Sequence, residues 1–217
     1  MARQALGRRG PLAEKRRAIV RAAQEVFLRE GFARAGVDAI AAVAGVSKRT
    51  VYNHYADKER LFLSVIEETI EPVITRFVQI ADRHLGAVTD LEGDLVAFGR
   101  EWVRLTVLSP EHAALLRLVV AEATHFPEVV DAWRGAGADR SHEVLTGHLG
   151  RIAAAGLLDI PDLDEAARHL TALVCNPPQS RSFFGTRPLA GDEVDELVTA
   201  AIRAFLRVYR PDPPRRA

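Results

Sequence analysis

The chain has 217 residues, and its 29 Lys and Arg are balanced by 29 Asp and Glu, so the formal net charge is zero. This length is ample for a substantial core, and no apolar run approaches the roughly 20 residues that span a membrane. The single Cys175 excludes an intramolecular disulfide framework. Because the N-terminus is basic and lacks an apolar stretch, we expect a cytoplasmic protein with no membrane partner.

The zero net charge hides an asymmetry along the chain. Residues 1–60 carry 13 Lys and Arg against 6 Asp and Glu, whereas residues 61–217 carry 16 against 23. A basic region attracts phosphate and gives salt-dependent affinity, while an acidic region is repelled by a duplex. The asymmetry favours a nucleic-acid partner for the first quarter of the chain, although chance clustering in an arginine-rich sequence gives the same counts.

Residues 1–13 combine arginines with glycine and proline, which predicts a flexible basic arm. Such an arm can enter a minor groove, or it can remain a solvated tail without specific contacts. The following stretch, residues 14–30, has apolar residues at helical spacing and stops at Gly31, so we predict a helix there. Its inner face would comprise Ile19, Ala22, Ala23, Val26 and Phe27.

Two short helices and a tight turn are predicted next. Apolar residues recur at helical spacing over 37–44, and Gly45 then ends that helix, because glycine tolerates the left-handed backbone of a helix end. Ser47 has the side-chain oxygen that caps a second helix, residues 48–55. A helix, a short turn with glycine and a capped helix form a helix-turn-helix, whose second helix enters the DNA major groove.

The second helix carries the predicted DNA contacts. Val51 and Tyr55 face the preceding helices, whereas the opposite face is rich in hydrogen-bonding groups. Arginine can bond guanine and asparagine can bond adenine, so Arg49 and Asn53 are the base-reading candidates, and Thr50 contacts a base or a phosphate. The candidates for phosphate contacts are Lys48, Tyr52, His54 and Lys58. The alternative is an amphipathic helix whose polar face is only solvated.

Residues 14–62 resemble the DNA-binding domain of the TetR (tetracycline-repressor-like) family. The matching residues are Ala22-Ala23, Phe27, Gly31-Phe32, Ile40-Ala41, Ala44-Gly45-Val46-Ser47, Val51-Tyr52, His54-Tyr55, Lys58-Glu59 and Leu61-Phe62. The resemblance implies that Tyr52, His54 and Lys58 hold phosphates and that helix 48–54 reads bases. The chain departs from the family at Ala35-Gly36, where Thr or Ser usually caps the next helix and touches a phosphate, which puts that one contact in doubt.

The rest of the chain is predicted to be helical, with Gly and Pro marking the turns between helices. A long helix runs over 57–86, and Pro72 within it either kinks the helix without consequence or acts as a hinge. Further helices are expected over 90–108, 111–125, 128–134, 138–156, 163–175 or beyond, and 191–209. No stretch alternates like a strand, so the fold class is all-α.

The stretch from Leu118 to Arg134, with Asp164 to Arg168, resembles the C-terminal domain of an AcrR/AefR-like subgroup of the same family. The resemblance implies a larger helical domain for ligand binding and dimerisation. The expected organisation is a basic arm (1–13), a three-helix helix-turn-helix DNA-binding domain (14–60), this larger domain (61–210) and a flexible tail (211–217).

Two apolar stripes are candidates for a dimer interface, since in the family two such helices from each subunit form a four-helix interface. Both stripes can instead be buried within one subunit. The break predicted at Asn176-Pro177-Pro178 would shorten the first helix. The interface candidates are Leu170, Leu173, Val174, Val194, Leu197, Val198, Ala201, Ile202 and Phe205.

A ligand pocket is expected among the helices spanning about 60–185, and aromatic and polar groups there are its candidate lining. Aromatic residues on helical stripes are more often core than ligand contacts, and a sequence does not show which groups converge. The pocket candidates are Phe98, Trp102, Glu122, His125, Phe126 and Trp133.

A metal-dependent helical enzyme is the competing class. Glu122 and His125 form one Glu-x-x-His motif, and Asp139 and His142 have the same spacing, but a di-iron bundle needs two such motifs and two further Glu. No nucleophile, phosphate-loop or zinc-protease motif is present. An architectural DNA-binding protein is disfavoured by the acidic second domain.

The sequence therefore predicts a TetR-like regulator that is not an enzyme and needs no cofactor. We expect a ligand-responsive repressor that binds a palindromic double-stranded DNA operator as a homodimer. Its small-molecule effector is not identified by the sequence.

Overall fold

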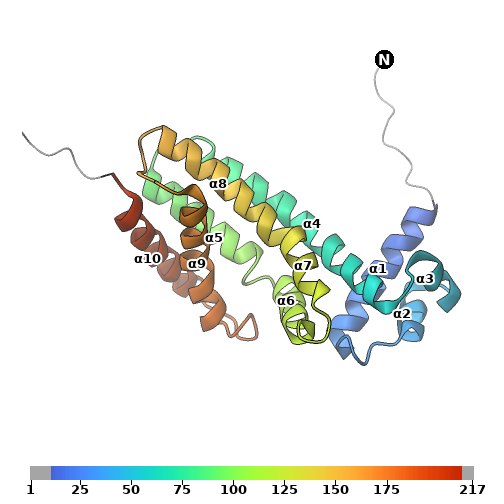
Figure 1. Cartoon of the computed structure of the whole chain (residues 1–217). Helices are drawn as coiled ribbons and strands as arrows, with labels where there is room; N and C mark the ends of the chain where they lie inside the picture. The colour runs from blue at the N-terminus through green and yellow to red at the C-terminus, as the bar shows by residue number, and fades with distance from the viewer. Residues whose placement is uncertain (1–10, 212–217) are drawn as a thin grey trace, which may run out of the picture. The chain divides into compact units, whose positions relative to one another are not determined.

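The computed structural model describes residues 11–211, and Figure 1 shows its helices. The described residues form helices and turns without a strand, so the prediction of an all-α fold is confirmed. Within this range no helix is both long enough and apolar enough to cross a membrane. The predicted basic arm, apart from residues 11–13, and the predicted tail, apart from Pro211, lie outside the described residues.

The helices follow the predicted order. They are α1 (Pro11–Glu30), α2 (Val37–Ala44), α3 (Lys48–His54), α4 (Lys58–Leu85), α5 (Leu91–Leu105), α6 (Pro110–Glu122), α7 (Glu128–Trp133), a π-helical turn (Arg134–Ala138), α8 (Asp139–Ala154), α9 (Leu163–Arg181) and α10 (Gly191–Tyr209). α1 starts at Pro11, three residues before the predicted start, because proline suits the first helical position, where its missing N–H has no intrahelical partner to lose. α4 continues through Pro72.

α9 corrects one prediction, because it does not break at Asn176-Pro177-Pro178 and continues to Arg181. Each proline removes a backbone donor. The side chains of Val174, Pro178 and Ser182 nevertheless form a buried row at four-residue spacing, and the Ser182 amide donates to the Pro178 carbonyl at 2.9 Å. Burial of this face keeps the segment helical despite the lost hydrogen bonds.

The described residues divide into two compact units. The smaller unit contains the described residues up to Glu68 and also the segment Leu118–Ala132, while the larger contains Thr69–Arg117 and the described residues from Trp133 onward. Residues 118–132, which the sequence assigned to the larger domain, thus pack with the helix-turn-helix. α4 and α6 each contribute residues to both units.

Aromatic packing forms the core of the smaller unit. The ring of Phe62 lies 5.1 Å from the ring of Phe27 and 5.0 Å from that of Phe32, measured between centroids. Phe126, from the segment 118–132, stacks on Phe32 at 6.1 Å. These contacts join α1, the start of α4 and the segment 118–132.

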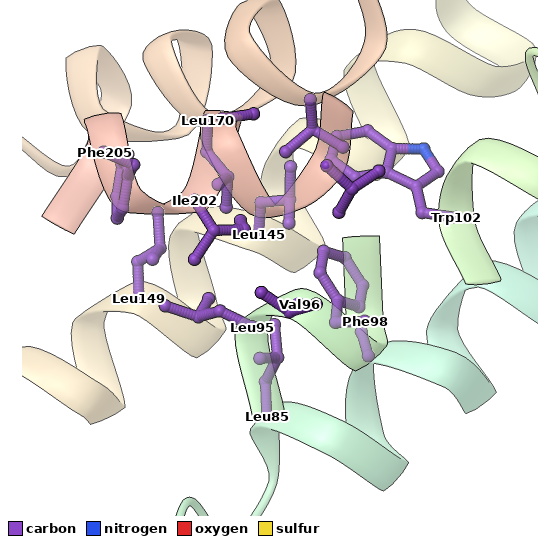
Figure 2. Close-up of a cluster of buried hydrophobic side chains, with 14 of the residues drawn as sticks. Leu85, Leu95, Val96, Phe98, Trp102, Leu145, Leu149, Leu170, Ile202 and Phe205 are labelled. Carbon is purple, nitrogen blue, oxygen red and sulfur yellow. The ribbon is translucent and has the colours of Figure 1, made fainter. Parts of the chain in front are cut away.

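The core of the larger unit brings together side chains from α4, α5, α8, α9 and α10, and Figure 2 shows how those of Leu95, Leu149 and Phe205 converge. α5 and α10 approach closely at Gly99, where an added Cβ would lie 2.8 Å from Val198 Cγ1. A side chain at this position would therefore force the two helices apart.

This core corrects most of the predicted dimer interface. Seven of the nine candidates are at most 6% exposed within a single chain, and they belong to the core of the larger unit: Leu170, Val174, Val194, Val198, Ala201, Ile202 and Phe205. Their stripes are buried against helices of the same subunit, so they are not available to a second one. Leu173 and Leu197 are only half-buried.

Replacing Gly99 by alanine tests the close approach of α5 and α10. We expect Gly99→Ala to lower the free energy of unfolding by about 1 kcal/mol net, because overpacking of ~1–3 kcal/mol exceeds the helical preference of alanine. Denaturant unfolding measures the change. The control is Gly147→Ala in α8, where an added Cβ would lie 3.9 Å from Arg151 Nη1. This variant should gain about 0.5–1 kcal/mol. Equal effects of the two substitutions would contradict the packing argument.

Candidate nucleic-acid interface and cavity

The turn between α2 and α3 has the geometry that the sequence predicts. Gly45 adopts the left-handed conformation, with φ of 67°, and the Val46 amide donates to the Ala41 carbonyl at 3.0 Å. The Thr50 amide then donates to Ser47 Oγ at 3.1 Å, which caps α3. The glycine ends one helix and the serine starts the next, so the orientation of α3 is set by local chemistry.

α3 has one buried and one exposed face. Val51 and Tyr55 are buried within the smaller unit. Arg49 and Asn53 are exposed, four residues apart, and neither side chain bonds to any residue in the range 11–211. An arginine and an asparagine free on one helical face have the groups needed to bond base edges in a major groove.

The other α3 candidates differ in their surroundings. The Lys48 ammonium pairs with Asp38 at 2.9 Å, and this hydrogen bond raises the pKa of Lys48. The Thr50 hydroxyl lies 2.8 Å from Ser47 Oγ, so it takes part in the helix cap. Tyr52 is exposed and His54 is half-buried at the helix end. Of these four, Tyr52 is the exposed residue whose polar group has no hydrogen-bond partner in residues 11–211, so its hydroxyl is free to bind a phosphate.

The structure corrects the expectation for Lys58. Its ammonium donates to three backbone carbonyls, at 2.8 Å to Phe32 and at 3.3 Å to both Ala33 and Ala35. An ammonium has three donors, so all of them are engaged within the protein. Lys58 fixes the loop between α1 and α2 to the start of α4, which leaves no donor for the phosphate contact predicted from the sequence.

The larger unit contains a cavity of about 310 Å³. Its apolar lining includes Ile70, Ile74, Phe77, Trp102, Leu116 and Trp133. In the described part of the chain, this cavity is lined without any Lys, Arg, Asp or Glu. It is therefore a mainly apolar, uncharged site of the kind that holds small organic molecules.

Most polar groups that line the cavity already have partners. The hydroxyls of Thr106, Ser141 and Thr171 each donate to the carbonyl four residues earlier in the same helix. His142 Nε2 lies 3.0 Å from Asp164 Oδ1. Burial raises the pKa of Cys175 to about 12, so its thiol stays protonated.

Of the polar side chains that line the cavity in the described range, His112 is the one with a fully buried atom that lacks a partner. Its ring packs against the ring of Trp133 at 4.9 Å between centroids, and its Nδ1 atom is buried without a hydrogen-bond partner in the described range. Burial lowers the pKa of His112 to about 4, so the imidazole is neutral at pH 7. Polar groups buried without a partner are rare and often have a functional cause.

One wall of the cavity has an unusual backbone. Phe184 lines the cavity, and it and Phe183 have φ angles of 55° and 48°, which bulky residues rarely adopt. The Arg117 guanidinium donates to the Phe184 carbonyl at 2.7 Å. Backbone strain of this kind is retained where the surroundings impose it, and it is common at ligand sites. A second irregular segment of backbone is the π-helical turn that follows Trp133, and Gly137 of this turn lines the cavity. Single π-helical turns are frequent at functional sites.

The structure separates the six predicted pocket residues. Trp102 and Trp133 line the cavity. Phe98 is fully buried in the core of the larger unit, and Glu122, His125 and Phe126 belong to the smaller unit. The expectation that these last four line the pocket is wrong, because apolar spacing identifies buried residues without showing which of them border empty space.

Sequence reasoning missed His112, Cys175 and Phe184. They lie on α6, on α9 and in the loop after α9 and meet only through folding. No sequence motif marks them.

The metal-enzyme alternative gains no support. In residues 11–211, no three His, Cys, Asp or Glu side chains are grouped so that they could hold a metal ion. His142, the second histidine of that hypothesis, lies against Asp164.

Two family descriptions match separate parts of the chain. Residues 19–65 match "Bacterial regulatory proteins, tetR family". Residues 93–211, more than half of the chain, match "AefR-like transcriptional repressor, C-terminal domain".

Individual proteins show the same similarity. The chain is 39% identical over 69 residues to the HTH-type transcriptional activator FasR of Mycolicibacterium smegmatis, a match that spans only 32% of each chain. A TetR-family transcriptional regulator from Mesorhizobium loti is 29% identical with a TM-score of 0.86, over 93% of this chain and 100% of that one. The flavonoid-responsive regulator FrrA is 28% identical with a TM-score of 0.70, over 92% of this chain and 98% of that one.

The buried imidazole of His112 gives a testable pH dependence. In the unfolded chain its pKa is about 6.5, so between pH 6.5 and 4 the unfolded state binds a proton that the folded state does not. The free energy of unfolding is therefore unaffected by this titration above pH 6.5, and it falls as the pH drops from 6.5 towards 4. We expect His112→Phe to reduce the loss of unfolding free energy across this window by up to about 3 kcal/mol.

Denaturant unfolding at several pH values measures this effect. The matched control is His125→Phe, because His125 is exposed, and it should keep the pH dependence of the unchanged protein. Parallel stability curves for the His112→Phe variant and the unchanged protein would rule out the neutral buried imidazole.

Proposed function

The chain belongs to the TetR family of bacterial transcriptional regulators, and we propose that it is a ligand-responsive repressor that binds a palindromic operator as a homodimer. The observation that carries the DNA-binding part is the capped helix α3 with Arg49 and Asn53 exposed on one face. The AefR-like repressor description, which matches residues 93–211, supports repression over activation.

α3 acts as the reading helix in this proposal. Arg49 and Asn53 bond base edges, while Tyr52 and His54 contact phosphates and fix the register. One helix of seven residues contacts few bases. Two copies in a twofold dimer read two half-sites about one helical turn of DNA apart, which gives the specificity that a single copy lacks.

Dimerisation uses the outer faces of α9 and α10, because the inner faces form the core. Leu197, Ala204 and Val208 share one face of α10 by helical spacing. The first two are half-buried, and the Val208 side chain is 67% exposed although it is apolar. Leu173 on α9 is also incompletely buried. A second copy packed on these residues would remove apolar surface from water.

The cavity supplies the ligand response. α6 lines it with His112, Ala113 and Leu116, and the residues of α6 from Leu118 onward belong to the smaller unit. α4 likewise combines cavity-lining residues with residues of the helix-turn-helix unit. A ligand that favours one arrangement of these helices shifts the population of conformations and lowers operator affinity. The similarity to the flavonoid-responsive regulator FrrA supports an organic effector.

Selection from random-sequence DNA at near-physiological salt tests the proposed function. The purified protein is mixed with the pool, and the retained DNA is sequenced. An enriched palindrome supports specific reading by a dimer. Absence of any enriched sequence contradicts it, because electrostatic attraction alone binds every duplex.

Arg49 and Tyr52 have different roles in this proposal. Arg49→Ala should weaken binding to the selected operator by about 1–3 kcal/mol and relax the base preference at one position of each half-site. Tyr52→Phe, which removes one hydroxyl, should weaken operator and non-specific DNA by the same factor. Fluorescence anisotropy on both kinds of DNA measures the four affinities. Identical behaviour of the two variants would remove the distinction between base-reading and positioning residues.

The dimer interface is tested with Val208→Glu. Burying this carboxylate between two subunits is unfavourable, so the variant should sediment as a monomer in analytical ultracentrifugation. Val120→Glu is the matched control, because Val120 is 62% exposed and belongs to the smaller unit, whereas α9 and α10 belong to the larger one. It should leave the dimer intact. A dimeric Val208→Glu variant would exclude this face of α10.

A further inference from the structure

The cavity has a specific chemical character. It is lined mainly by apolar side chains, and no residue in its described lining has a permanent charge. A charged ligand would lose its hydration without an oppositely charged partner, which costs more free energy than apolar contacts return. The lining therefore selects against carboxylates, phosphates and ammonium groups.

Aromatic rings form several parts of the wall. Trp102 packs edge-to-face on Phe77, with centroids 5.3 Å apart and planes at 61°. The indole of Trp133 packs against the imidazole of His112, with their centroids 4.9 Å apart. Both tryptophans of the chain thus border the same space. Aromatic walls favour a flat aromatic ligand, which can stack on one ring and meet the edge of another.

The imidazole of His112 supplies the polar anchor. A neutral imidazole has one donor nitrogen and one acceptor nitrogen, and Nδ1 has no partner among the described residues. The hydroxyls of Thr106, Ser141 and Thr171 already donate within their own helices. A hydroxyl on the ligand both donates and accepts, so it matches either nitrogen of the ring.

We propose that the effector of this cavity is an uncharged aromatic compound whose hydroxyl group hydrogen bonds to the His112 imidazole. This inference rests on the proposed function in one respect, namely that the cavity is the site at which the effector binds. It adds the chemical class of the ligand and the residue that selects it.

Three probes that share one ring system test the proposal: 2-naphthol, naphthalene and 2-naphthoate. Their affinities for the full-length protein are measured at pH 7 by calorimetry, with the protein injected into each ligand. We expect 2-naphthol to bind about tenfold more tightly than naphthalene, the value of one net hydrogen bond. 2-Naphthoate should bind more weakly than naphthalene, because its carboxylate stays charged.

His112→Phe assigns the preference to the imidazole. It keeps a ring of similar size and removes both nitrogens, so 2-naphthol and naphthalene should then bind equally. His112→Gln keeps a neutral hydrogen-bonding group and should retain part of the preference, and it serves as the second variant if His112→Phe does not fold. His125→Phe, at an exposed position, is the matched control and should bind like the unchanged protein.

Three results would overturn the inference: tightest binding of 2-naphthoate, a preference for 2-naphthol that survives in His112→Phe, or no binding of any probe. The proposed ligand response is judged separately, by operator affinity with and without 2-naphthol. An unchanged operator affinity despite the expected binding preference counts against the response and leaves the assignment of ligand chemistry in place.

Discussion

Phe32 holds the smaller unit together, because rings from three parts of the chain pack on it or next to it. Its ring stacks on Phe62 of α4 and on Phe126 of the segment 118–132. The Lys58 ammonium lies 4.5 Å above the same ring while it donates to the Phe32 carbonyl. Aromatic and cation–π contacts depend on orientation as well as distance. A shift of Phe126 would therefore alter the surroundings of the first residue of α4.

This arrangement gives α6 a place in the proposed coupling of ligand and DNA binding. A helix moves largely as one body, because its backbone hydrogen bonds join each turn to the next. The first turns of α6 border the cavity, and its last turn leads to Phe126. Coupling between distant sites requires an element whose arrangement both sites influence. α6 meets this requirement because it contributes residues both to the cavity lining and to the smaller unit, and the same holds for α4.

The sequence predicted those features that depend on local chemistry. The helix stop at Gly45 and the cap at Ser47 need only neighbouring residues, and the structure confirms both. Helix ends elsewhere fell within a few residues of the prediction. The break at Pro177-Pro178 was wrong, since the local preference of proline is outweighed by burial of Val174 and Pro178 against distant helices.

Other features depend on which partners fold together, and here the sequence was insufficient. The stripe through Val198 and Phe205 is apolar whether its partner is the same chain or a second copy, because the hydrophobic effect is non-directional. Likewise, the sequence predicts Lys58 as a phosphate ligand, because the three carbonyls that accept from its ammonium are all more than twenty positions away along the chain. The cavity required the convergence of α4, α5, α6, α8 and α9, for which no periodicity gives a signal.

The unpartnered imidazole of His112 also explains how an apolar cavity can discriminate. Apolar contacts alone give similar affinities to all rings of similar size, since their contribution follows the buried area. A buried polar nitrogen that is left without a hydrogen-bond partner costs about 1–3 kcal/mol. A ligand that satisfies this nitrogen removes that cost, whereas a ligand without a hydrogen-bonding group leaves it in place. Ligand selectivity and the stabilisation of the fold by the ligand therefore have the same physical origin, and the ligand that binds best is also the one that stabilises the fold most.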